Sequence, residues 1–173
     1  MLLRKFELRW KIEDSVLVPD DVNWTLPTTI AGIMNEITKE LYNEVVVIFC
    51  YDFDKKPLGY CIVGEGTHYI SLVNVDSIMR AAMLTGARNI VICHNHPNGD
   101  PIPSREDLIT TGKLIAALLP AEVKVLDHLI MGKNNTFVSL RKHYEYMWLK
   151  VYNMYESINS LLKETAETIY EDA

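Results

Sequence analysis

The stretch NIVIC, residues 89–93, constrains the fold of this chain more than any other. It is a short apolar run rich in β-branched residues, and the polar, proline-containing sequence HNHPNGDPIP follows it at once. A strand that is apolar without alternation is typically buried on both faces of its sheet. The rest of the chain must therefore supply a layer of helix on each side of this strand.

Apolar periodicity in the first half of the chain predicts a helix and further strands. A helix is expected from Pro27, because the apolar residues after it recur at spacings of three and four. They are Ile30, Ile33, Met34, Ile37 and Leu41. In residues 44–66, two β-branched and aromatic runs flank the turn DKKP, which predicts a strand hairpin. Residues 3–12 roughly alternate polar and apolar side chains and predict an opening strand.

The second half of the domain predicts two more helices and two more strands. Asp76 is a candidate N-cap of a helix that Gly86 ends. The expected inward face of that helix comprises Ile78, Met79, Ala82 and Met83. Another helix should run from Ser104 to about Leu119, followed by the strand VKVLDHLIMG and the short strand TFVSL. This order of elements predicts an α/β fold, with a mixed β-sheet flanked by helices.

The tail predicts one long C-terminal helix from Arg141 to Tyr170. One broad apolar face recurs along it, made of Tyr144, Met147, Trp148, Val151, Met154, Tyr155, Ile158 and Leu162. Such a face fits packing on the domain or contact with a partner, including a second copy in a homo-oligomer. We therefore divide the chain into a domain of residues 1–140 and a C-terminal helix of residues 141–173.

Charge and cysteine content narrow the class of protein. The formal net charge of −6 argues against a chain whose main role is to neutralise phosphates, so nucleic acid is an unfavoured partner. Three cysteines lie inside apolar runs and are expected to be reduced, buried thiols: Cys50, Cys61 and Cys93. No apolar stretch approaches the roughly 20 residues that cross a bilayer, and the charged N-terminus does not look like a signal peptide. A cytoplasmic protein without a membrane partner is expected.

The segment CHNHPNGDPIPSRED, residues 93–107, predicts a metal site. His94 and His96 directly follow the buried strand, and side chains two apart on a strand point the same way. The loop then turns the chain, and Ser104 opens a helix with Asp107 in its first turn. Two imidazoles and one carboxylate from neighbouring elements, with a fourth position left for water, form the ligand set of catalytic zinc.

An alternative explanation covers part of the same segment. Ser104 can cap the helix, and Asp107 three residues later suits the N-terminal end of the helix dipole. Capping does not account for two histidines on one face of the preceding strand. The letters HNH do not indicate a nuclease, because the residues of that motif are spread over a longer ββα unit.

The same segment carries a family resemblance. HNHPNGDPIPSRED resembles the metal-binding core of the JAB/MPN (JAMM) metalloprotease superfamily, whose pattern is His-x-His-Pro followed by Ser-x-x-Asp. The RadC-like branch is the nearer match, since HNHPSG…PSRED and a later LDHIIIG recur there, and this chain has HNHPNG…PSRED and VLDHLIMG. The resemblance covers roughly residues 40–140. It implies the JAB/MPN fold, with its cytidine-deaminase-like layering, and Zn²⁺ bound by His94, His96 and Asp107.

The resemblance also implies roles for residues outside the ligand set. Family members place a glutamate base just before an apolar strand, which corresponds to Glu44, with Glu65 as the alternative. Ser104 corresponds to the hydrogen-bond donor of the developing oxyanion. His128 matches a family position that is not a metal ligand, so we expect it in the core or behind the ligands. From the residues alone, Cys93 should face away from His94. His68 and His143 are expected to be exposed.

Three functions follow as hypotheses. The first is a zinc metalloprotease that cleaves a peptide or isopeptide bond in a protein or peptide substrate, with Glu44 as the base. The second is a non-catalytic interaction module of the MPN type, with the tail helix as its docking surface. The third is a RadC-like factor associated with DNA repair, which rests on the family's name alone. RadC-like proteins usually carry an N-terminal helix-hairpin-helix region, whereas some forty unrelated residues precede the core here.

Overall fold

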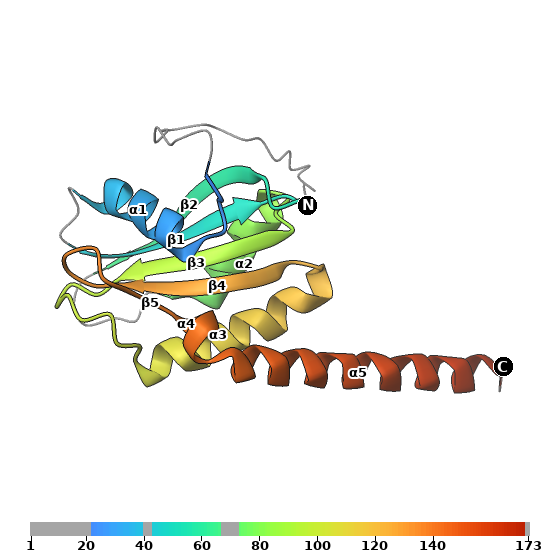
Figure 1. Ribbon diagram of the computed structural model, residues 1–173. Coiled ribbons are helices and arrows are strands. Elements are labelled where there is room, and N and C mark those ends of the chain that lie inside the picture. The colour runs from blue at the N-terminus through green and yellow to red at the C-terminus, as the bar shows by residue number, and fades with distance from the viewer. Residues whose placement is uncertain (1–21, 40–42, 67–72, 172–173) are drawn as a thin grey trace, which may run out of the picture.

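The computed structural model describes residues 22–39, 43–66 and 73–171, which form a five-stranded sheet and the helices around it (Figure 1). The elements are, in chain order, α1 (Pro27–Thr38), β1 (Glu44–Tyr51), β2 (Pro57–Gly66), α2 (Val75–Leu84), β3 (Asn89–Asn95), α3 (Arg105–Leu118), the 3₁₀ helix η1 (Leu119–Ala121), β4 (Lys124–Met131), β5 (Phe137–Ser139), α4 (Leu140–His143) and α5 (Glu145–Glu171). The strand expected at residues 3–12, together with Leu41 and His68, lies outside the described residues.

The sheet is mixed, in the order β2-β1-β3-β4-β5. β1 and β2 form the expected hairpin, β1 also pairs antiparallel with β3, and β3 pairs parallel with β4. The crossover from β3 to β4 runs through α3, as parallel strands require. β3 lies at the centre of the sheet, and its first six residues are buried. The strand buried on both faces that NIVIC predicts is therefore confirmed.

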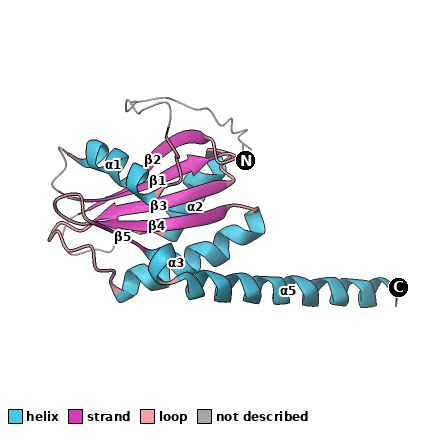
Figure 2. Cartoon of the chain, viewed as in Figure 1, coloured by secondary structure: helices cyan, strands magenta, loops and turns pink. Residues whose placement is uncertain are grey.

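Helices cover both faces of the sheet, as expected for an α/β fold (Figure 2). α1 packs on one face, where it buries Ile30, Ala31 and Met34 against alternate residues of β1, β3 and β4. α2, α3 and the first turns of α5 pack on the other face. Ile90, Ile92 and the other strand side chains that point to this second face form the larger part of the core. Alternation along β3 thus sends neighbouring residues into two separate cores.

Two details of α2 correct the sequence-based prediction. The N-cap is Asn74, whose side chain accepts hydrogen bonds from the backbone amides of Asp76 and Ser77. Asp76 instead lies in the first turn and pairs with Arg80. Both Asn and Asp cap helices well, and the sequence analysis named only Asp76. Met83 was expected to face inward but is 56% exposed, whereas the predicted Ile78 and Ala82 are buried and Met79 packs partly against the core.

The tail is helical but not one helix. α4 ends at His143, Tyr144 adopts a non-helical backbone, and α5 starts at Glu145. Trp148 is buried and donates its indole N–H to the carbonyl of Val125 at 2.9 Å. The expected apolar face packs only over its first turns, since Met154, Ile158 and Leu162 are exposed. The second half of α5 extends beyond the ends of the strands (Figure 1).

The three cysteines are free thiols, as expected. Cys50 and Cys93 are buried, and Cys61 is half-buried. Among the described residues, no helix is both long enough and apolar enough to cross a membrane.

Candidate metal centre

The end of β3 and the start of α3 bring three metal-binding side chains together. His94 and His96 project from the same side of the strand end, and Asp107 comes from the first turn of α3. The Nε2 atoms of the two histidines are 3.0 Å apart. The carboxylate oxygens of Asp107 lie 3.4 Å from Nε2 of His94 and 3.6 Å from Nε2 of His96. This buried group could hold a metal ion, since one ligand atom of each residue lies within 4.8 Å of the others.

The cap of α3 places the carboxylate of this group. The side chain of Ser104 accepts a hydrogen bond from the backbone N–H of Asp107 at 3.1 Å. One oxygen of Asp107 accepts from the backbone N–H of Ser104 at 2.8 Å and from its hydroxyl at 2.6 Å. This reciprocal arrangement is a capping box, so the predicted cap is confirmed. Capping and metal binding are compatible here, because the cap fixes the carboxylate that faces the histidines.

A buried hydrogen-bond chain behind His94 fixes its tautomer. The single hydroxyl proton of Thr111 goes to the carbonyl oxygen of Asp107, 2.6 Å away, because a carbonyl can only accept. Thr111 Oγ1 must then accept from Nδ1–H of His128, also at 2.6 Å. Nε2 of a neutral His128 is left as an acceptor for Nδ1–H of His94 at 2.8 Å. The Nε2 lone pair of His94 therefore points toward His96 and Asp107.

His96 presents the same nitrogen as His94. Its Nδ1 lies 2.7 Å from the carbonyl oxygen of Asp100, so Nδ1 carries the proton and Nε2 is free to coordinate. Two Nε2 lone pairs facing one another at 3.0 Å repel unless a proton or a metal ion lies between them. Ligand atoms placed tetrahedrally about 2.0–2.2 Å from zinc are about 3.3–3.6 Å apart. The two histidine–carboxylate separations, 3.4 and 3.6 Å, lie in this range, and the 3.0 Å between the two Nε2 atoms is slightly shorter.

The electrostatics of the site keep His94 and Asp107 in the forms that bind metal. Burial lowers the pKa of His94 to about 4, and burial also holds the pKa of His128 well below its usual value. Burial would raise the pKa of Asp107, but hydrogen bonds and charge from His96, His94 and Ser104 outweigh it and lower that pKa. At neutral pH the site thus offers a neutral His94 and an ionised Asp107. The Asp107 carboxylate, as a hydrogen-bond acceptor for His96, raises the pKa of His96.

Glu44, the expected base, lies at the start of β1, beside the histidine strand. Val46 pairs with His94 across the two antiparallel strands, so Glu44 lies on the same face of the sheet as His94. The charge of Glu44 also contributes to the raised pKa of His96. Glu65 is exposed and lies on β2, directly opposite Val45, so it projects from the other face of the sheet.

Asn95, between the two histidines, ties the start of β1 to the end of β3. Its side-chain oxygen accepts from the backbone N–H of Val45 at 2.8 Å, and its amide nitrogen donates to the carbonyl of Asn43 at 3.0 Å. These two bonds flank Glu44 and continue the link between the strands where the backbone pairing ends. These two hydrogen bonds, here called the Asn95 clamp, therefore fix the position of Glu44 relative to the histidines.

The other histidines and Cys93 lie where the sequence predicts, within the part of the chain that is described. Cys93 is buried on the opposite face from His94, and His143 is exposed. His128 is buried directly behind His94. The sequence-based prediction missed Thr111 and Asn95. The spacing of Thr111 from Asp107, one helical turn, was the only signal for the former.

Comparisons with known proteins find one family model and several relatives that match this chain. Residues 24–145 match the family model described as the RadC-like JAB domain. A UPF0758 protein of Clostridium perfringens is 35% identical over 116 residues, which are 67% of this chain and 51% of that protein. For a UPF0758 protein of Methanosarcina barkeri the identity is 30% over 136 residues, 79% of this chain and 58% of that protein. The chain spans about half the length of the curated relatives it matches, and their names state no activity.

Proposed function

This chain belongs to the RadC-like JAB domain family, and from that premise we propose that it is a zinc-dependent hydrolase of peptide or isopeptide bonds. Family membership confirms the resemblance predicted from residues 93–107. The observation that carries the proposal is the cluster of His94, His96 and Asp107, a donor set that suits catalytic zinc. The side chain of His96 is 18% exposed, so one side of the cluster faces solvent, where a substrate and water can approach.

His94, His96 and Asp107 would hold the zinc ion. When bound, zinc supplies Lewis acidity, which lowers the pKa of water from 15.7 toward about 7 and polarises a scissile carbonyl. Glu44 accepts the proton of the attacking water and passes it to the leaving amine. Its place on the histidine face, held by the Asn95 clamp, supports Glu44 over Glu65 for this role.

Ser104 is the proposed donor to the oxyanion of the tetrahedral intermediate. Its hydroxyl donates a hydrogen bond to the Asp107 carboxylate in this structure, with the two oxygens 2.6 Å apart. Donation to an oxyanion therefore requires the hydroxyl to rotate, which is easier when a metal ion shares the negative charge of Asp107. Ser104 thus combines the cap of α3 with the oxyanion role.

A direct test uses the zinc-loaded chain and a library of fluorogenic peptides together with isopeptide-linked substrates. Glu44→Gln should lower kcat/KM by about 10²–10⁴-fold, because the proton acceptor is lost, while the zinc content stays unchanged. Glu65→Gln is the matched control and should retain activity, since Glu65 projects from the other face of the sheet. Full hydrolysis by Glu44→Gln would reject Glu44 as the base.

A non-catalytic interaction module is the second candidate. Its support is the exposed apolar side chains on the second half of α5, which include Ile158, Leu161 and Leu162. Glu44→Gln separates the two functions, because binding of a partner through α5 should survive the substitution and hydrolysis should not. A role on DNA has no comparable support among the described residues, and the net charge of −6 opposes it.

A further inference from the structure

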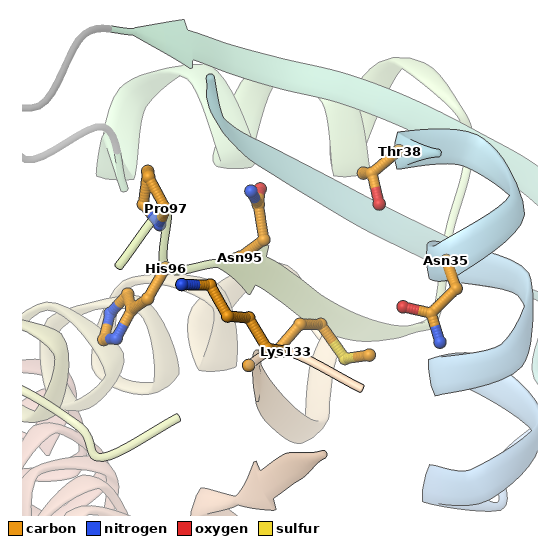
Figure 3. Close-up of a pocket in the computed structure, with 8 residues that line it drawn as sticks. Asn35, Thr38, Asn95, His96, Pro97 and Lys133 are labelled. Carbon is orange, nitrogen blue, oxygen red and sulfur yellow. The ribbon is translucent and has the colours of Figure 1, made fainter. Parts of the chain in front are cut away.

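A cavity of about 270 Å³ lies beside the candidate metal centre (Figure 3). It is formed where three elements end: β3 at Asn95 and His96, β4 at Met131, and the last turns of α1 at Asn35. His96 belongs to both the cavity and the metal cluster, so the two adjoin. In open α/β sheets, ligands bind in the crevice outside the carboxyl ends of parallel strands. β3 and β4 are the parallel pair of this sheet, and the cavity lies at their carboxyl ends.

Lys133, in the turn after β4, supplies the charge of this cavity. Its side chain runs toward Asn95 and His96, with the ammonium group at the near end (Figure 3). No lining residue among those described is acidic. Nor does any described carboxylate form an ion pair with Lys133, whereas Arg80, Arg88 and Arg141 each have one. Among the described residues, no carboxylate neutralises the ammonium group, so it can bind an anionic ligand.

The loop at Gly99 packs closely on the turn that carries Lys133 and fixes the direction of the lysine side chain. The backbone N–H of Lys133 donates to the carbonyl of Gly99 at 2.9 Å. A Cβ on Gly99 would lie 2.2–2.6 Å from the Cγ, Cδ and Cε atoms of Lys133, so only glycine leaves room for the lysine stem. Gly99 also has a φ of +80°, a conformation that other residues rarely adopt. Gly132 is equally confined, since a Cβ there would lie 2.7 Å from the carbonyl oxygen of Gly99.

Apart from Lys133 and His96, the polar side chains that line the cavity are uncharged amides and a hydroxyl. The amide nitrogen of Asn35 donates to Asn135 at 2.9 Å, which joins α1 to the turn that carries Lys133 and leaves the Asn35 carbonyl oxygen available. Thr38 lines the same wall. One cation beside neutral amide and hydroxyl groups suits a ligand that combines a carboxylate with peptide amides.

We propose that this cavity is a substrate subsite for an acidic peptide. Lys133 binds a carboxylate on the part of the peptide that lies beside His96. The role of the cavity as a substrate subsite rests on the proposed hydrolase function. Binding of a carboxylate can nevertheless be measured without any cleavage. Lys133 is a specificity-determining residue in this account. It takes no part in the chemical step.

The experiment titrates N-acetylglutamate into the metal-free full chain and follows backbone amide signals by NMR. Removing the metal matters because a carboxylate could otherwise bind zinc directly. We expect saturable shifts centred on Gly99, Gly132 and Lys133, with affinity that weakens as salt rises. Lys133→Met keeps the unbranched stem that packs on Gly99 and should weaken binding about five- to tenfold. Lys142→Met is the matched control on an exposed lysine of α4 and should bind like the wild type.

Unchanged affinity in Lys133→Met, or shifts centred elsewhere, would overturn the subsite. Tighter binding of inorganic phosphate than of N-acetylglutamate through Lys133 would overturn its assignment to a carboxylate. If the chain proves to cleave peptides, the same variants give a second readout. Lys133→Met should then raise KM for a substrate with glutamate near the scissile bond and leave the glutamine analogue unaffected. Failure of the hydrolase proposal alone would leave the NMR result intact.

Discussion

At the scale of single residues, Thr111 and His128 decide how well the centre can bind metal. Thr111→Val removes the acceptor of His128 Nδ1–H, so His94 is no longer held in the tautomer that offers Nε2. We expect zinc affinity to fall about 10–100-fold, as for other supporting residues of metal ligands. Competition with a chromogenic chelator measures the affinity. Thr110→Val, the same change at the neighbouring position, should retain the wild-type value.

How far the site could be predicted depends on where the contacts of each residue come from. His94, His96, Ser104 and Asp107 lie within 14 residues of one another, and strand alternation plus helix capping bring them together. The roles of Thr111 and Asn95 depend on His128 in β4 and on the backbone of β1, respectively. Those partners are 17 and 50 residues away, and no local pattern indicates which side chains meet across a sheet.

At the scale of elements, the two halves of α5 should contribute very differently to stability. Trp148 is fully buried and donates to Val125, so Trp148→Ala should reduce the free energy of unfolding by about 3–5 kcal/mol. Leu162 is 61% exposed, and Leu162→Ala should change it by less than about 0.5 kcal/mol. Urea denaturation followed by circular dichroism measures both. Equal effects of the two substitutions would mean that the distal half of α5 packs on the domain.

Apolar periodicity in the sequence predicts the helices and strands, but it does not predict how much of each apolar face is buried. The apolar period predicts the tail as helical, and the structure agrees apart from the break at Tyr144. The apolar period continues along the part of α5 that extends beyond the ends of the strands (Figure 1). There the described part of the domain does not cover Ile158 or Leu162, which are exposed. Periodicity identifies the apolar side of a helix but carries no information on the length of the surface it meets.

At the scale of the whole molecule, the buried histidines should make the metal-free protein sensitive to mild acid. The pKa of His94 is lowered by burial to about 4 in the folded state and is about 6.5 in the unfolded chain. The folded state therefore binds fewer protons, and this contribution to stability is present above pH 6.5 and lost as the pH falls toward 4. His128 acts in the same direction, and the raised pKa of His96 partly opposes it.

The expected result is a loss of about 2 kcal/mol in the free energy of unfolding between pH 7 and pH 5. Urea denaturation of the chelator-treated chain at the two pH values measures it. His143→Gln, on an exposed histidine, should keep the same dependence. A stability that is flat or rises toward pH 5 would contradict a neutral, buried His94.

The proposed metal centre requires that His94, His96 and Asp107 share one metal ion. Elemental analysis of the purified, zinc-equilibrated chain measures this, beside His96→Ala, Asp107→Asn and the control His143→Ala. The account predicts about one equivalent of zinc in the wild type and in His143→Ala, and little or none in the two ligand variants. A wild type without stoichiometric metal, or ligand variants that keep it, would contradict the account.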